Sequence, residues 1–209
     1  MRSVLITGAT GGLGTAVVAA FEAQGDRVIG VGHPGYDLTR PEDAARAVKD
    51  VGGPLGALIH LMGGFAGGQP VAATDDATWR RMMSMNLDAA FYMARAAVPA
   101  LLASPGGRIV MVGSRTAVEP AANLAAYNAS KAGLVALVRT LALEVGPRGA
   151  TANVVLPSVI DTPGNRAAMP TADPAQWVAP ASIAGLIAWL ASPAASDVNG
   201  AVIPIYGRA

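Results

Sequence analysis

The stretch TGATGGLG (residues 7–14) follows directly on the apolar run VLI (residues 4–6) and leads into an Ala/Val-rich helical pattern. Its glycines have the spacing G-x-x-x-G-x-G, at positions 8, 12 and 14. Glycine permits a tight turn from strand to helix, and free N–H groups at a helix start attract anions such as a pyrophosphate. Because glycine-rich turns also occur for purely structural reasons, the motif needs support from the rest of the chain.

Beyond this turn, short apolar runs alternate with longer helical patterns, which is typical of βαβ units. The runs lack polar alternation, so helices should cover both faces of the sheet. We predict one α/β domain over residues 1–209, a Rossmann-type doubly wound parallel sheet of about seven strands. Strands are expected near 2–7, 27–31, 36–38, 55–61, 107–113, 150–156 and 201–206. Helices are expected near 12–24, 41–50, 75–103 (bent or broken around Asn86), 124–146 and 181–192.

Composition narrows the class of protein. Of 209 residues, 52% are hydrophobic and 14% charged, enough apolar material for a well-filled core. A net charge of +1 without long runs of one sign indicates neither nucleic acid nor an anionic membrane as partner. The absence of cysteine excludes disulfides, thiolate metal sites and a cysteine nucleophile. Without a signal-peptide layout at its start or an unbroken apolar span, the chain is expected to be soluble, cytoplasmic and free of metal.

Two segments rich in proline and glycine, 63–70 and 157–180, each follow an expected strand. In a doubly wound sheet such segments lie at the carboxyl edge, where ligands bind. The second segment is long for a connector, which favours a substrate loop over about 158–180.

Four further residues carry candidate chemistry. Tyr127 and Lys131 are four residues apart on an expected helix and therefore share one face. A phenol has a pKa of about 10, and a neighbouring cation lowers it towards the range useful for acid–base catalysis. Ser114 ends an apolar strand thirteen residues before Tyr127, and Asn86 interrupts a helical pattern although asparagine is a poor helix former. Taken singly, each has a plainer interpretation: a surface pair, a loop serine and a tolerated helix asparagine.

Together these features resemble the short-chain dehydrogenase/reductase family, from the first expected strand to the last. The family has the motif T-G-x-x-x-G-x-G at its first turn, which residues 7–14 match. It also has an Asn–Ser–Tyr–Lys tetrad, matched in order by Asn86, Ser114, Tyr127 and Lys131. The resemblance implies an NAD(P)(H)-dependent oxidoreductase that transfers hydride between nicotinamide and a carbonyl or alcohol substrate.

The resemblance also implies a role for each tetrad residue. Tyr127 is expected to be the general acid in reduction and the base in oxidation. Lys131 is expected to bind the nicotinamide ribose hydroxyls and, with the positive nicotinamide, to lower the pKa of the tyrosine. Ser114 is expected to orient and polarise the substrate oxygen, and Asn86 to hold a water that links Lys131 to solvent.

Further contacts follow from the same resemblance. The implied cofactor-binding residues are Gly8, Thr10, Gly12, Leu13, Gly14, His33, Asp37, Leu38, Met62, Gly63, Tyr127, Lys131, Pro157, Ile160 and Thr162. The implied substrate pocket contains Phe65, Ser158, Met169 and Trp177. For the large apolar members of the pocket, packing of the loop is an equally good interpretation.

The chain departs from the family pattern in several places. HLMG (residues 60–63) stands where the family has N-N-A-G, and His60 is interpreted as a packed strand-end residue rather than a catalyst. Ser158 replaces the usual glycine after Pro157, and the short connection after the second strand lacks a crossover helix. Asp37 is interpreted equally well as an adenine contact or as a turn or helix-capping acid. Gly32 stands where an acid would bind the ribose of NAD, so we expect a slight preference for NADP(H), with His33 beside the phosphate.

Two segments resemble quinonoid dihydropteridine reductase within the family: residues 63–68 and residues 161–177. That subgroup lacks the tetrad serine, whereas Ser114 is present here, so ordinary carbonyl reduction and pterin reduction both remain open. A non-catalytic dinucleotide-sensing protein is the alternative from another class. Relatives pair through helices corresponding to 88–103 and 124–146, which implies a homodimer or homotetramer.

Overall fold

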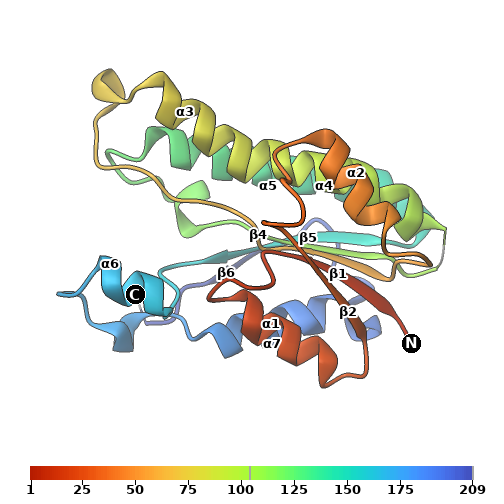
Figure 1. Cartoon of the computed structure of the whole chain (residues 1–209). Helices are drawn as coiled ribbons and strands as arrows, with labels where there is room; N and C mark the ends of the chain where they lie inside the picture. The colour runs from red at the N-terminus through yellow and green to blue at the C-terminus, as the bar shows by residue number, and fades with distance from the viewer. Residues whose placement is uncertain (104, 209) are drawn as a thin grey trace.

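The computed structural model describes residues 1–103 and 105–208. Within them, six parallel strands form one sheet in the order β2-β1-β3-β4-β5-β6, with helices on both faces (Figure 1). The strands are β1 Ser3–Thr7, β2 Arg27–Val31, β3 Ala57–His60, β4 Arg108–Val112, β5 Thr151–Pro157 and β6 Val202–Ile205. The helices are α1 Gly14–Glu22, α2 Pro41–Lys49, α3 Asp76–Met83, α4 Ala89–Leu102, α5 Ala125–Val145, α6 Pro163–Ala168 and α7 Pro180–Leu190. Shorter 3₁₀ turns span Val71–Ala73, Arg115–Ala117, Gly146–Arg148, Pro174–Gln176 and Pro193–Ala195.

The sheet separates two apolar layers, which explains why its strands are apolar without alternation. On one face, Leu5 and Leu58 pack with α2, α4 and α5. On the other face, Val4 and Ile6 pack with α1 and α7. Figure 1 shows the same division, with α2, α3, α4 and α5 on one side of the sheet and α1 and α7 on the other. The prediction of a doubly wound parallel sheet covered on both faces is confirmed.

The predicted strand at 36–38 is wrong. Parallel strands need a crossover of about a dozen residues or more, and residue 36 follows the end of β2 after only a short turn. The backbone N–H groups there are used locally instead: Tyr36 donates to the Gly32 carbonyl, and Asp37 donates to the Asp43 carboxylate. The sheet therefore has six strands in the described residues, and β2 lies at its edge.

The predicted helix over 75–103 is three pieces of helix in continuous sequence. Between α3 and α4, residues Ser84–Asp88 form a π-helix. The expected bend around Asn86 is thus a local widening of the helix, a feature often found at functional sites. The sequence reading missed α6, a helix of six residues that lies within the expected substrate loop.

The parallel arrangement brings the connections that follow the strands to the same carboxyl edge of the sheet. The segments after β1, β2, β3, β4 and β5 all lie there, and each carries residues that the sequence singled out. No helix in the described part of the chain is both long enough and apolar enough to cross a membrane.

Candidate functional site

The turn between β1 and α1 has the geometry of an anion cradle. Gly8 has a φ of +69° and donates to the Val31 carbonyl, which ties the turn to β2. A Cβ at Gly14 would overlap the Gly8 carbonyl oxygen, so only glycine fits there. Among the described residues, the N–H groups of Gly12, Leu13 and Gly14 donate to no protein acceptor. These free donors at the start of a nine-residue helix fit a pyrophosphate.

The turn is joined to β3 through a hydrogen-bond network that the sequence did not reveal. The Thr7 hydroxyl oxygen accepts from the N–H groups of Leu61 and Met62, both at 3.1 Å. Because both lone pairs are then occupied, the hydroxyl donates its own proton to His60 Nδ1, 3.1 Å away. His60 is therefore protonated on Nε2, which is buried and has no partner in the described residues.

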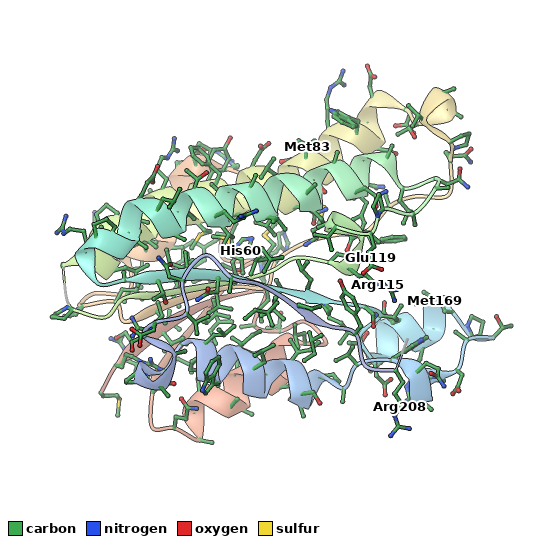
Figure 2. The ribbon with its side chains drawn as sticks, turned by 180° about the vertical axis from the view of Figure 1, so that it is seen from behind. His60, Met83, Arg115, Glu119, Met169 and Arg208 are labelled. Atoms are coloured by element: carbon green, nitrogen blue, oxygen red, sulfur yellow. The ribbon has the colours of Figure 1, made fainter. Side chains whose placement is uncertain are left out.

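His60 is fully buried between the sheet and the layer of α4 and α5, as Figure 2 shows. Burial, with a smaller contribution from the charge of Lys131, lowers its pKa from 6.5 to about 3. A neutral imidazole at every physiological pH suits the packed residue that the sequence indicated better than a general base.

Asn86 is clamped by the loop after β3. Its Oδ1 accepts from the Gly64 N–H at 2.8 Å, and its Nδ2 donates to the Gly64 carbonyl at 3.1 Å and to the Ser130 hydroxyl at 3.0 Å. A Cβ on Gly63 would lie 2.8 Å from Asn86 Oδ1 and 3.2 Å from Lys131 Nζ. Gly63 thus allows the asparagine and the lysine to approach the same stretch of backbone. Ser130, one helical turn beyond Tyr127, also belongs to this hydrogen-bond network, and the sequence did not identify it.

Ser114, Tyr127 and Lys131 converge at the carboxyl edge. Ser114 follows β4, and its Oγ lies 3.1 Å from Thr116 Oγ1. Lys131 is 5% exposed, donates to the Val112 carbonyl at 3.2 Å, and places Nζ 6.0 Å from the centroid of the Tyr127 ring. Burial lowers the pKa of Lys131 to about 8.

The expected lowering of the Tyr127 pKa is not found. Burial raises the pKa of Tyr127 above its ordinary value, and the Ser114 hydroxyl beside the phenol opposes this effect only in part. The physical reason is that removing water from a phenolate costs more than one hydroxyl neighbour returns. In the protein alone, Tyr127 is therefore a protonated acid.

The segment after β5 closes over the glycine turn. Thr162 caps α6 by accepting from the Asn165 N–H, and its methyl group would lie 2.8 Å from a Cβ on Gly12. Ile160 and Val178, near the two ends of the loop, are joined by a β-bridge. The loop therefore leaves and rejoins the fold at one place and contacts the turn that fits a pyrophosphate.

The expected pocket residues have different surroundings. Phe65 packs edge-on against Tyr127, with ring centroids 5.0 Å apart, and remains 68% exposed. Ser158 donates its hydroxyl proton to the Tyr206 carbonyl at 2.7 Å, so this hydroxyl is engaged with the end of β6. Met169 ends α6 and Trp177 follows a 3₁₀ turn, both on the loop after β5.

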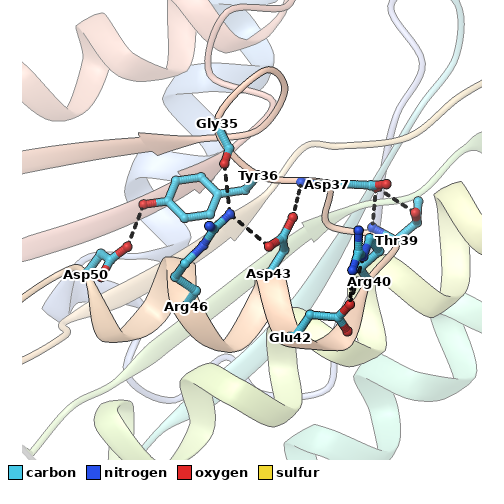
Figure 3. A network of polar contacts seen from close by, with 9 residues as sticks. All are labelled: Gly35, Tyr36, Asp37, Thr39, Arg40, Glu42, Asp43, Arg46 and Asp50. Carbon is cyan, nitrogen blue, oxygen red and sulfur yellow. Dashed lines mark hydrogen bonds and ion pairs between the residues drawn. The ribbon is translucent and has the colours of Figure 1, made fainter.

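The connection between β2 and α2 forms an exposed polar network (Figure 3). The Asp37 carboxylate accepts from the Thr39 N–H at 3.1 Å and from its hydroxyl at 2.6 Å, which lowers the pKa of Asp37. Asp37 therefore closes a turn ahead of α2, whose N-cap residue is Arg40. Leu38 is 1% exposed and packs in the core. His33 follows Gly32 and is exposed.

Comparisons with known proteins agree with this geometry. Residues 35–207 match the family model described as enoyl-(acyl carrier protein) reductase. The chain is 33% identical to the 3-oxoacyl-[acyl-carrier-protein] reductase MabA of Mycobacterium tuberculosis, over 99% of this chain and 92% of that protein. It is 34% identical to the cyclic-di-GMP-binding biofilm dispersal mediator protein of Escherichia coli, over 99% and 96% of the two chains.

Among solved structures, the fold superposes with a TM-score of 0.90 on a proposed NAD(P)-dependent gluconate 5-dehydrogenase from Beutenbergia cavernae with bound NADP. The two share 29% identity, and the match covers 99% of this chain and 95% of that one. The chain therefore belongs to the short-chain dehydrogenase/reductase family and is an oxidoreductase of that family.

Proposed function

We propose that this protein transfers hydride between NAD(P)(H) and a small carbonyl or alcohol substrate through Asn86, Ser114, Tyr127 and Lys131. The observation that carries the proposal is the convergence of the last three residues at the edge of the sheet that also holds the glycine turn with free N–H donors. A phenol, a hydroxyl and an ammonium group so placed suit proton transfer to an oxygen atom.

The bound nicotinamide supplies the hydride chemistry. In reduction, the Tyr127 phenol donates its proton to the substrate oxygen, and the raised pKa keeps that proton in place beforehand. Ser114, within reach of the same phenol, orients and polarises the substrate oxygen. Lys131 keeps two of its three protons for the ribose hydroxyls and a water, since one is donated to Val112. Asn86, next to Lys131 across Gly63, holds the water that returns a proton to the site.

Oxidation of an alcohol needs Tyr127 in its deprotonated form, because a base must accept the proton of the alcohol. The Lys131 charge and the positive charge of an oxidised nicotinamide then lower the pKa of Tyr127 against the effect of burial. The same residues would therefore serve both directions with a pKa that depends on what is bound.

For the cofactor, we propose a slight preference for NADP(H). The cradle residues are those at 8–14, and the edge of the site is formed by Met62, Gly63, Pro157, Ile160 and Thr162. Support comes from Gly32, which places no carboxylate beside a 2′-phosphate, and from the exposed imidazole of His33. Residues 1–209 would form one NAD(P)-binding domain of a cytoplasmic homodimer or homotetramer, with residues 158–180 as the substrate loop.

The test is Tyr127→Phe with Tyr36→Phe as the matched control. Tyr36 donates its hydroxyl proton to Asp50 at the end of α2, so its loss removes one phenol that is not part of the tetrad. Tyr127→Phe should lower kcat by about 1000-fold or more while cofactor affinity, measured by nicotinamide fluorescence, stays within about twofold. Unchanged turnover in Tyr127→Phe would refute the mechanism.

Two alternatives have a specific observation in their favour. Phe65 packs edge-on against Tyr127 at the site, as an aromatic wall for a planar pterin would. Parallel assays with quinonoid dihydropterin and with simple ketones separate this alternative from ordinary carbonyl reduction. The name of the Escherichia coli relative favours a dinucleotide-binding role. Calorimetry with cyclic di-GMP, together with a carbonyl panel that shows no turnover, would support that role instead.

A further inference from the structure

We propose that residues Tyr206–Arg208, called the strap, position the substrate loop against the segment that carries Ser114. The strap follows β6 and contacts two parts of the chain that are far apart in sequence: the loop between Ser158 and Val178, and the segment Arg115–Glu119. This inference rests on the proposed function for its substrate, but its first test does not need turnover.

The strap contacts the loop both where the loop begins and where it returns to the fold. At the start, the Ser158 hydroxyl donates to the Tyr206 carbonyl at 2.7 Å, next to the bond from the Ser158 N–H to the carbonyl of Ile205, the last residue of β6, at 3.3 Å. At the return, the Arg208 N–H donates to the Gln176 carbonyl at 3.3 Å. Between them, Gly207 has a φ of +69°, and a Cβ there would lie 3.0 Å from the Gln176 carbonyl oxygen. The strap therefore lies flat on the loop in a conformation that favours glycine.

The strap also contacts the other wall of the site through one aromatic ring. The Arg115 guanidinium lies over the Tyr206 ring, 4.8 Å from its centroid. Arg115 Nε donates to the Glu119 carboxylate at 2.7 Å, and Figure 2 shows Arg115 and Glu119 together near the base of the loop. Burial and the neighbouring Glu119 carboxylate raise the pKa of the Tyr206 phenol, in keeping with this close packing.

Arg115 directly follows Ser114, so the strap joins the two walls between which the substrate oxygen would lie. A half-exposed ion pair contributes little by itself, but a cation stacked on an aromatic ring restricts both partners. Arg115 and Tyr206 are thus positioning residues: they hold the loop at a fixed distance from Ser114. Loss of the contact should free the loop and weaken substrate binding.

The first experiment measures loop opening by limited trypsin digestion of the purified protein, followed by mass spectrometry. Arg166 lies on α6 inside the loop and is paired with Asp161, so cleavage after Arg166 reports on local opening. Arg115→Met and Tyr206→Ala should each speed this cleavage about fivefold or more. The matched control is Arg80→Met, which removes an exposed arginine–aspartate pair on α3 and should leave the rate unchanged. Cleavage of Arg115→Met and Tyr206→Ala at the control rate would overturn the proposal.

The second experiment separates positioning from simple stability. The KM for the carbonyl substrate should rise about tenfold in Arg115→Met, while kcat falls less. Arg115→Lys, which keeps a cation over the ring, should restore most of the wild-type KM, and Tyr206→Phe, which keeps the ring, should behave likewise. Faster cleavage with an unchanged KM would show that the strap holds the loop without positioning substrate, and would overturn that part of the inference. If no substrate turns over, the proposed function fails, and the trypsin result still judges the strap.

Discussion

The chain has two histidines, and they lie in two polar regions of opposite character. His60 belongs to a buried cluster with Thr7 and Asn86, in which hydrogen bonds join residues 22 to 55 positions apart. His33 lies in the exposed connection around Asp37, where hydrogen bonds join residues only 2 to 14 apart. Figure 3 shows the second region as a surface network of short-range pairs.

This difference decides what each region contributes. A polar group in the buried cluster cannot turn to water when its partner is removed, so each lost contact leaves a buried donor or acceptor unpaired. A polar group in the exposed connection exchanges its partner for water at little cost. The two regions therefore allow matched substitutions, in which the same change is made once in each.

The largest expected effect is on acid stability. The folded state does not protonate His60 until about pH 3, whereas the unfolded chain binds that proton near pH 6.5. Protons therefore favour the unfolded state as the pH falls through this window, and the cost reaches roughly 4 kcal/mol at its lower end. Urea unfolding at a series of pH values should show a shallower loss of stability in His60→Asn. His33→Asn should keep the wild-type slope, and an equally steep slope in both variants would contradict the prediction.

Removal of the Asn86 side chain should cost about 2 to 4 kcal/mol of unfolding free energy. It leaves the Gly64 N–H and carbonyl without the side chain that pairs them, and the Ser130 hydroxyl loses the hydrogen bond that it accepts but keeps the one that it donates to the Tyr127 carbonyl. The matched change, Asp37→Ala, should cost about 1 kcal/mol or less because the hydrogen bonds that it removes are exposed to water. Chemical denaturation of both variants measures the difference. Equal losses of unfolding free energy would show that hydrogen bonds in the buried cluster stabilise the protein no more than those at the surface.

Adding one methyl group tests the packing of each region. Gly63→Ala should destabilise the protein by about 1 to 3 kcal/mol and lower kcat, because the new Cβ meets Asn86 Oδ1 at 2.8 Å and Lys131 Nζ at 3.2 Å. Gly35→Ala should change stability by less than about 0.5 kcal/mol, since the nearest atom to a Cβ there is 3.7 Å away. Thermal unfolding and steady-state kinetics on the two variants check both statements. A wild-type kcat in Gly63→Ala would show that Asn86 and Lys131 can move to accommodate the new Cβ without any effect on turnover.

The smallest expected effect concerns cofactor choice at the exposed connection. His33→Asn should raise the KM for NADPH about threefold and leave the KM for NADH unchanged, because only NADPH has a phosphate to contact the imidazole. Initial rates with both cofactors measure the ratio. A parallel rise for both cofactors would place His33 outside the phosphate site.

Much of the fold was predictable because its signals are local. Apolar runs without alternation marked β1, β3, β4 and β5, and the predicted helices match α1, α2, α5 and α7 to within a few residues at each end. The predicted strand at 36–38 was wrong because the connection from β2 is too short for the crossover that a parallel strand requires. α6 was missed because a six-residue helix shows too little periodicity to stand out from a proline-rich loop.

The candidate site divides in the same way. Residue types and spacing identified Asn86, Ser114, Tyr127 and Lys131, and the parallel sheet placed the last three together. Other contacts were not predictable, because each depends on a residue far away in the chain. They are the hydrogen bonds of Asn86 to Gly64, those of the Thr7 hydroxyl to the backbone after β3, and that of Ser158 to Tyr206.

The sequence by itself determined the periodicity of the elements, the glycine turn and the one-turn spacing of Tyr127 and Lys131, since these depend on neighbours along the chain. Only the tertiary structure decided which groups lose their water. It buried His60 and Lys131 so that both are easier to deprotonate, and it raised the pKa of Tyr127 where the sequence indicated a lowered one. Desolvation depends on everything packed around a group, and that environment exists only in the folded chain.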